Sequence, residues 1–141
     1  MKAAIMNVLR IHHVAFAHPE GTDVYDVLTK VLNLPLVHTE HADGLIERMI
    51  DTGGGYLQTL EAVGEDGVIK RFTDRRGAGL HHVALEVDDL AATVLDLIDR
   101  GVEMIDTTPR PGGDGTMVAF VHPRATSGLL IELVEETGDR S

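Results

Sequence analysis

Two pairs of adjacent histidines are the side chains of this sequence best suited to chemistry. His12-His13 and His81-His82 each begin the tetrapeptide His-His-Val-Ala, and the two copies stand almost half the chain apart. Neutral imidazole is the commonest biological metal ligand. The chain contains no cysteine, which excludes disulfides, thiolate nucleophiles and thiolate-bound metals. A metal site here would therefore use imidazole and oxygen ligands, with one imidazole supplied by each copy of the repeat.

Alternation along a strand indicates which histidine of each pair faces a ligand, because successive side chains point to opposite faces. In the second copy the apolar positions from Val83 onward share the face of His81, and this face is expected to pack against a helix. His82 then lies on the opposite, more polar face. The same alternation puts His12 on the apolar face and His13 on the polar one. We therefore expect His13 and His82 to line one site.

Oxygen ligands are expected from the last strand of each half of the chain. Glu132 stands in an apolar run, where an unpaired carboxylate would be costly, so its position indicates metal coordination or another functional role. Gln58 is its nearest counterpart in the first half and can bind a metal through its amide oxygen. Two imidazoles and two oxygens suit a catalytic divalent ion such as cobalt, zinc, nickel, manganese or iron(II).

The elements that would position these residues occur twice in the order strand, helix, strand, strand, strand. Each double histidine begins a strand, and amphipathic helices are predicted over residues 24–32 and 90–98. Further strands are predicted over residues 36–39, 45–50, 56–61, 103–105, 116–122 and 129–134. The pattern predicts an α+β fold in which two tandem βαβββ modules, about residues 9–62 and 79–135, form a half-open cup-shaped mixed sheet with helices on the convex side. Residues 1–141 would form a single domain.

Composition excludes several classes of protein. The 141 residues include 12 Lys and Arg against 23 Asp and Glu, for a net charge of −11, which argues against a nucleic-acid partner or a polybasic membrane anchor. No apolar run approaches the roughly 20 residues that cross a bilayer, and no secretory signal is visible. We expect a cytoplasmic protein with no membrane contact.

The residues resemble the vicinal oxygen chelate superfamily and, within it, the methylmalonyl-CoA epimerase family. The resemblance extends over about residues 9–135. The motifs that carry it are His13-Val14-Ala15, His38-Thr39-Glu40 and residues 76–82, 86–89, 109–112, 120–123 and 128–133. It implies an isomerase, forming a homodimer, that epimerises methylmalonyl-CoA or a closely related 2-substituted acyl-CoA. The implied reaction removes and returns the proton beside the thioester carbonyl, through an enolate stabilised by a divalent metal, cobalt first and otherwise zinc, nickel or manganese.

The same resemblance assigns roles to particular residues. The family's metal ligands fall on His13, Gln58, His82 and Glu132, the set already indicated by the residues themselves. A catalytic carboxylate of the family falls on Glu47, which makes Glu47 and Glu132 the expected pair for proton transfer. Without the resemblance, Glu47 would be interpreted as a solvated strand residue.

An acyl-CoA substrate carries several negative charges, so it would need a group of basic side chains on this acidic chain. The available candidates are Lys70, Arg71, Arg75, Arg76, Arg110 and Arg124. Ordinary solvation of a surface explains these residues equally well.

Three alternatives share the fold. A lactoylglutathione lyase of the glyoxalase I type usually has glutamate at the position of Gln58. An extradiol dioxygenase would hold iron(II) with His13, His82 and Glu132. A metal-free small-molecule binding protein would need none of these ligands. Two departures from the epimerase pattern are His12, where an acidic residue is frequent, and a short loop at residues 41–43, which puts the acyl group in question.

Overall fold

The fold is built from two compact units, and two strands of the chain contribute residues to both units. The computed structural model describes residues 7–137, of which unit 1 comprises residues 7–12 and 82–137, and unit 2 residues 13–81. The strands belong to one eight-stranded mixed sheet with the order β2-β3-β4-β1-β5-β8-β7-β6. The predicted α+β class, with its twice-occurring strand, helix, strand, strand, strand order, is confirmed. Whether residues 1–141 form a single domain stays a prediction.

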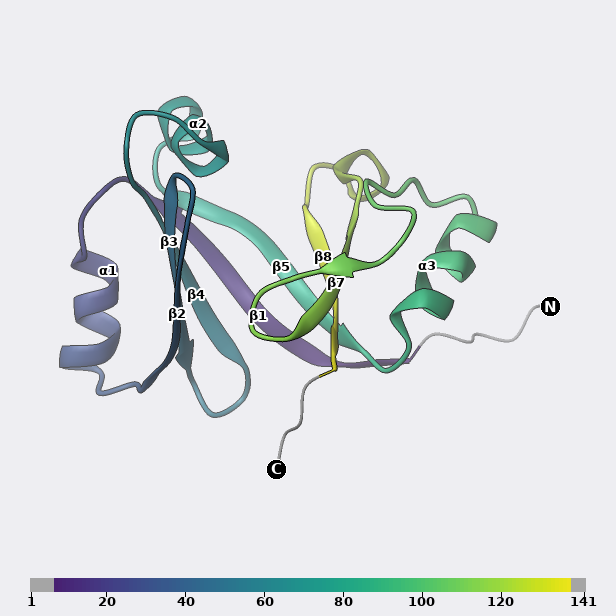
Figure 1. Ribbon diagram of the computed structural model, residues 1–141, viewed down its shortest axis with the longest axis horizontal. Helices are drawn as coiled ribbons and strands as arrows, with labels where there is room; N and C mark the ends of the chain where they lie inside the picture. Colours follow the sequence, from purple (N-terminus) through teal and green to yellow (C-terminus); the bar gives the residue numbers. More distant parts are fainter. Residues whose placement is uncertain (1–6, 138–141) are drawn as a thin grey trace. The chain divides into compact units, whose positions relative to one another are not determined.

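Unit 2 contains the first four strands in the order β2-β3-β4-β1 (Figure 1). They are β1 (Val8–His18, from His13 onward), β2 (Leu36–Ala42), β3 (Leu45–Asp51) and β4 (Tyr56–Ala62). β1 runs parallel to β4, whereas β2, β3 and β4 pair antiparallel through short turns. The three predicted strands that follow the first helix are confirmed, with each start as predicted and each end one to three residues later.

The first helix forms where it was predicted, but its apolar side is largely exposed. A short α-helix, α1 (Asp23–Asp26), continues into a π-helical segment, η1 (Val27–Val31), which ends near Asn33 with a positive φ of 59°. The side chains of Val27, Val31 and Leu32 are 50%, 69% and 58% exposed. These side chains are therefore not part of a buried core.

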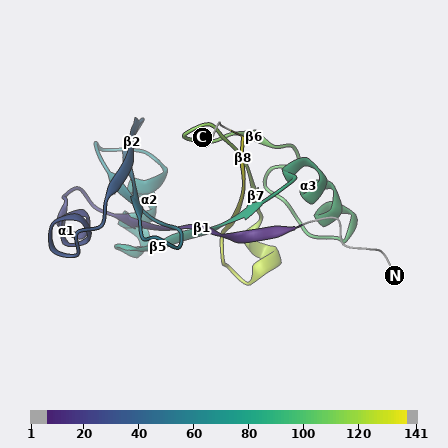
Figure 2. The ribbon, with the colours of Figure 1, turned by 90° about the horizontal axis from the view of Figure 1, so that it is seen from below.

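Unit 1 contains β5 (Gly79–Val87, from His82 onward), β6 (Arg110–Pro111), β7 (Thr116–Val121) and β8 (Ile131–Glu136), with the short 3-10 helix η2 (Pro123–Thr126). Helix α3 (Leu90–Asp99) lies beside this sheet (Figure 2) and packs into its core through Leu90 and Val94. The carboxylate of Asp89 accepts a bond from Ala92 N at 3.0 Å and caps the helix as predicted. Leu85 and Val87 contact this core, so the helix-facing side of β5 is also confirmed.

Two elements differ from the sequence expectation. The strand predicted at residues 103–105 is reduced to one bridge between Met104 and Val121, and a two-residue strand, β6, forms in the segment expected to be a break. A helix that was not predicted, α2 (Val68–Arg76), follows β4, with Ile69 and Thr73 buried. Its apolar residues follow a short helical repeat that could have indicated the helix, but charged residues interrupt that repeat.

At each double histidine the chain passes from one unit to the other. The division falls between His12 and His13 and again between His81 and His82. His12 and His13 are both only 4% exposed, although strict alternation would place adjacent side chains on opposite faces of a single layer. Both faces of a strand can be covered, and His12 lies in a cluster of its own with Glu86 and Glu136. Within residues 7–137, no helix has the length and apolar character needed to span a membrane.

Candidate active site

In unit 2 a hydrogen bond connects the side chains of Glu47 and Gln58. The two residues lie on adjacent strands, since Glu47 of β3 is opposite Leu60 and Gln58 is two residues earlier on β4. Gln58 Nε2 donates a hydrogen bond of 2.8 Å to Glu47 Oε1. A solvated, solitary position for Glu47 is therefore wrong, because this carboxylate is held in place by a buried amide.

The other end of the Gln58 amide is left available. Its side chain is 4% exposed, and its Oε1 atom has no hydrogen-bond partner among residues 7–137. A buried amide oxygen without a partner is costly, so its location needs an explanation. A metal ion would satisfy this oxygen, and the bond from Nε2 to Glu47 fixes which end of the amide is free to bind one. The residue therefore fits the predicted ligand role.

His13 lies on the same face of unit 2 as Gln58. The Cα partner of Gln58 on β1 is Ala15, two residues after His13, and residues two apart on a strand share a face. His13 is buried, and so is Ala15, which packs in the core that includes Leu60. Unit 2 thus presents an imidazole, an amide oxygen and a carboxylate from three neighbouring strands.

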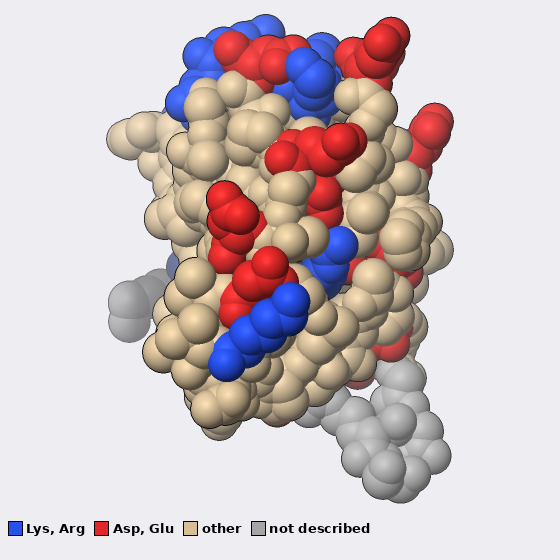
Figure 3. Space-filling view, turned by 90° about the vertical axis from the view of Figure 1, so that its left-hand side faces the viewer, with Lys and Arg blue, Asp and Glu red and all other residues tan. Residues whose placement is uncertain are grey.

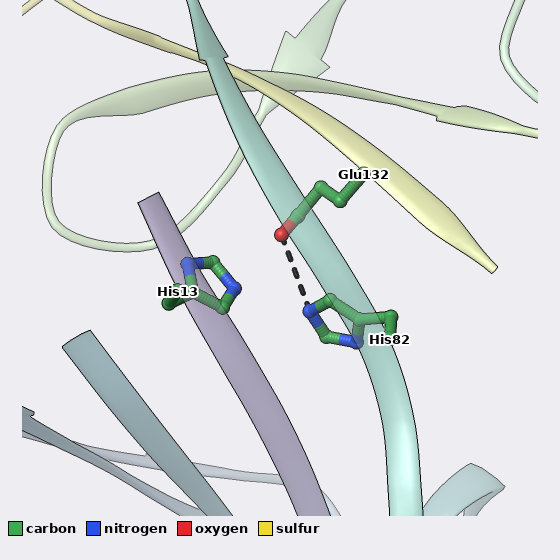
Figure 4. A group of neighbouring side chains, drawn as sticks. All are labelled: His13, His82 and Glu132. Carbon is green, nitrogen blue, oxygen red and sulfur yellow. Dashed lines mark ion pairs between the residues drawn. The ribbon is translucent and has the colours of Figure 1, made fainter. Parts of the chain in front are cut away.

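In unit 1 the side chains of His82 and Glu132 lie within ion-pair distance of each other. His82 Nε2 and Glu132 Oε1 are 3.3 Å apart, as the dashed line in Figure 4 shows. Glu132 lies opposite Ala84 of β5 and Phe120 of β7, and its side chain is 12% exposed. The Phe120 ring meets the His82 ring edge-on, with centroids 5.6 Å apart, and this contact restricts the orientation of the imidazole. Sequence reasoning did not single out Phe120.

Each unit supplies donors of the types that bind a divalent cation. His13, His82 and Glu132 each offer one imidazole nitrogen or carboxylate oxygen, and Gln58 offers its amide oxygen. Each predicted site residue is buried or half-buried on a strand, and the assignment of ligand roles to these residues stays a prediction.

Alternation had predicted that His12 packs with the apolar face, and this prediction is wrong. His12 Nε2 lies 2.5 Å from Glu136 Oε1, and its imidazole groups with the carboxylates of Glu136 and Glu86 in unit 1. Arg10 Nε donates to Glu86 Oε1 at 2.8 Å. The cluster has donors that could hold a metal, but the Arg10 cation already neutralises one of its carboxylates. We interpret it as a buried ion-pair network.

A second buried carboxylate, Glu61, supports the sheet of unit 2. Glu61 accepts hydrogen bonds from Gly21 N at 2.9 Å and from Arg48 Nη1 at 2.7 Å. Burial raises the pKa of Glu61, but these two donors outweigh burial and hold the pKa below its ordinary value. Glu61 is therefore a charged structural anchor between β4 and the loop that precedes α1.

The candidate basic residues differ in their surroundings. Arg110 bonds to Asp106 and stacks over Phe120, with its guanidinium carbon 5.5 Å from the ring centroid. Arg124 makes two bonds to the carboxylate of Glu103, which lowers the pKa of that carboxylate. Both guanidinium groups are thus engaged by carboxylates of unit 1.

Comparison with known proteins defines the class of the chain. It belongs to the Glyoxalase/Bleomycin resistance protein/Dioxygenase superfamily, also called vicinal oxygen chelate, whose family model matches residues 12–120. The resemblance inferred from the motifs is thereby confirmed.

Within that superfamily, several of the similar proteins are methylmalonyl-CoA epimerases. The mitochondrial methylmalonyl-CoA epimerase of Dictyostelium discoideum is 33% identical over 132 residues, which cover 90% of this chain and 78% of that protein. The crystal structure of methylmalonyl-CoA epimerase from Mycobacterium tuberculosis matches with a TM-score of 0.85 and 32% identity, over 97% of this chain and 94% of that one. A methylmalonyl-CoA epimerase in complex with methylmalonyl-CoA and NH4+ matches with a TM-score of 0.83 and 30% identity, over 94% and 97%. The chain is an enzyme, an isomerase of the epimerase type.

Proposed function

We propose that this enzyme epimerises methylmalonyl-CoA, or a closely related 2-substituted acyl-CoA, at the carbon beside the thioester. The similar epimerases support the substrate class, and one of the matching structures contains methylmalonyl-CoA. The observation that carries the reaction type is the hydrogen bond from Gln58 to Glu47. It fixes a carboxylate that can accept a proton while it leaves an amide oxygen available to a metal.

Glu47 and Glu132 are the groups that we assign to proton transfer. Epimerisation requires one group to remove the α-proton and another to return a proton to the opposite side of the carbon. Gln58 orients Glu47 for the first role, and His82 contacts Glu132, the candidate for the second. The low exposure of Gln58, His82 and Glu132 limits competing proton exchange with water.

The proposed metal ligands are His13, Gln58, His82 and Glu132. A divalent metal bound there would supply Lewis-acid stabilisation of the negative charge that develops on the thioester oxygen. The imidazole and oxygen donors fit cobalt, which the resemblance favours, and also zinc, nickel or manganese. Glu132 then belongs to both the ligand set and the proton-transfer pair.

Deuterium exchange tests the proposal directly. The purified chain is loaded with cobalt and incubated with methylmalonyl-CoA in heavy water, and mass spectrometry follows the gain of one deuterium at the α-carbon. We expect enzyme-dependent exchange that a chelator abolishes and that added metal restores. Absence of exchange with all four metals, together with turnover of a hemithioacetal, would instead establish the lyase reaction.

The homodimer and the cytoplasmic location inferred from the sequence stay predictions. Sedimentation of the purified chain across a range of concentrations tests the dimer. A mass near 15.3 kDa at every concentration would reject it.

A further inference from the structure

Helix α2 lies on the face of unit 2 that carries Gln58. Ile69 and Phe72 of α2 pack against a core that includes Leu60 and Ala62 of β4. Gln58, Leu60 and Ala62 alternate along β4 and share one face, with Ala62 about 13 Å from Gln58 along the strand. The helix therefore covers the continuation of the surface on which the candidate catalytic residues of this unit lie.

Basic side chains gather on this helix. Figure 3 shows Lys and Arg side chains at the end of the molecule where α2 lies, mixed with Asp and Glu. Lys70 pairs with Asp74 over 2.5 Å, and Arg71 Nη1 pairs with Asp66 Oδ1 over 2.7 Å. These two cations are thus already matched by neighbouring carboxylates.

Arg75 and Arg76 differ from the other two cations of the helix. Both are exposed in the last turn of α2, and neither forms an ion pair with any residue in the range 7–137. The guanidinium of Arg76 lies over the ring of Phe72, 5.4 Å from its centroid, and Phe72 in turn contacts the His81 ring at 5.0 Å. The stacked contact orients Arg76 and leaves its N–H groups directed to solvent-accessible partners.

A purely structural role accounts for only part of this arrangement. Cations in the last turn interact favourably with the helix dipole, by about 0.3–1 kcal/mol each. One basic residue would meet that need, whereas this helix ends in two exposed arginines without carboxylate partners among residues 7–137, on a chain of net charge −11. Guanidinium binds phosphate oxygens in a bidentate manner, which makes phosphate the ligand that this pair suits best.

We propose that Arg75 and Arg76 bind phosphate groups of the CoA part of the substrate. The inference rests on the proposed function, since it assumes an acyl-CoA whose thioester lies near Glu47 and Gln58. The flexible pantetheine arm of CoA separates the thioester from the phosphates. The arm would pass beside α2, because Leu60 and Ala62 of β4 are buried beneath this helix.

The test compares a full and a truncated thioester. The variant Arg75→Ala/Arg76→Ala is assayed with methylmalonyl-CoA and with methylmalonyl-pantetheine, which lacks the nucleotide and its phosphates. We expect KM for the CoA thioester to rise by about tenfold or more with kcat unchanged, and KM for the pantetheine thioester to stay unchanged. Arg75→Lys/Arg76→Lys should recover part of the affinity. The matched control is Arg71→Ala on the same helix, which should leave both KM values unchanged.

A binding measurement separates this inference from the proposed reaction. Calorimetry with adenosine 3′,5′-diphosphate, which carries phosphates but no reactive thioester, should show weaker binding to the double alanine variant than to the unsubstituted protein. Equal binding to both proteins, or an equal rise in KM for both thioesters, overturns the assignment of Arg75 and Arg76. Absence of deuterium exchange with either thioester in the unsubstituted protein would overturn the proposed function. The calorimetry with adenosine 3′,5′-diphosphate would then decide by itself whether Arg75 and Arg76 bind phosphate.

Discussion

Replacing Glu47 by glutamine separates the basicity of this side chain from its shape. Gln58 Nε2 donates to Glu47 Oε1 over 2.8 Å, and a glutamine at position 47 has an oxygen in the same place to accept that bond. The substitution therefore removes the ability to take a proton and preserves the contact. Loss of the charge on the acceptor weakens the hydrogen bond by about 1 kcal/mol, which predicts a decrease in Tm of roughly 3 °C.

The effect on the reaction should be far larger than the effect on stability. A positioned general base contributes about 10²–10⁴-fold to a rate, so the Glu47→Gln enzyme should exchange deuterium at least about 100-fold more slowly. Its metal content, measured by elemental analysis, should equal that of the unsubstituted protein. Glu47→Asp keeps a base but withdraws it by about 1.5 Å, the length of one carbon–carbon bond, so an intermediate rate is expected.

The matched control is Glu40→Gln. Glu40 lies on β2 directly opposite Glu47, carries the same group and is more exposed, so its replacement should leave exchange unchanged. Exchange by Glu47→Gln at the unsubstituted rate would refute the assignment of Glu47 as a base. Loss of the metal in this variant would refute the assignment in another way, because it would make Glu47 a ligand.

Two further predictions concern stability. Glu61→Gln should lower the free energy of unfolding at pH 7 by about 2 kcal/mol, because it weakens the bonds from Gly21 and Arg48 to a charged acceptor. Since the pKa of Glu61 lies below its ordinary value of 4.5, this stabilisation is present above that pH and is lost as the pH falls through the folded-state pKa. Urea denaturation across this range should show the two proteins converging, and a pH-independent difference would contradict the reasoning. Asp89→Ala removes the cap bond to Ala92 and should cost about 1 kcal/mol, measured by thermal unfolding; an unchanged Tm would show that this cap adds nothing.

The sequence was most informative where two copies of a pattern could be compared. The repeated double histidine and the strand alternation indicated His13 and His82 as site residues, and the structure buries both side chains. The same logic failed for His12. Its segment of β1 belongs to unit 1, where His12 pairs with Glu136. This pairing depends on a contact between residues far apart in the chain, which a local pattern does not reveal.

Other features depended on information that a local pattern does not contain. The hydrogen bond between Gln58 and Glu47 follows from the antiparallel register of β3 and β4, which is defined only once the turn between them has formed. Helix α2 was missed because four basic residues obscured a short apolar repeat. In η1 the spacing of apolar residues indicated a helix correctly, but it could not reveal the π-helical geometry.

The passage of β1 from one unit to the other at the first double histidine also has consequences for the order of folding. Residues 13–81 form a continuous segment, so unit 2 can gather all its strands early in synthesis. Residues 7–12, by contrast, find their partners only after the chain has continued past residue 82, and closing so long a loop carries an entropic cost. Until then Val8, Leu9 and Ile11, which remain 49%, 51% and 53% exposed in the folded chain, are more exposed still and are vulnerable to association with other chains. Truncation after residue 81 would make that vulnerability permanent.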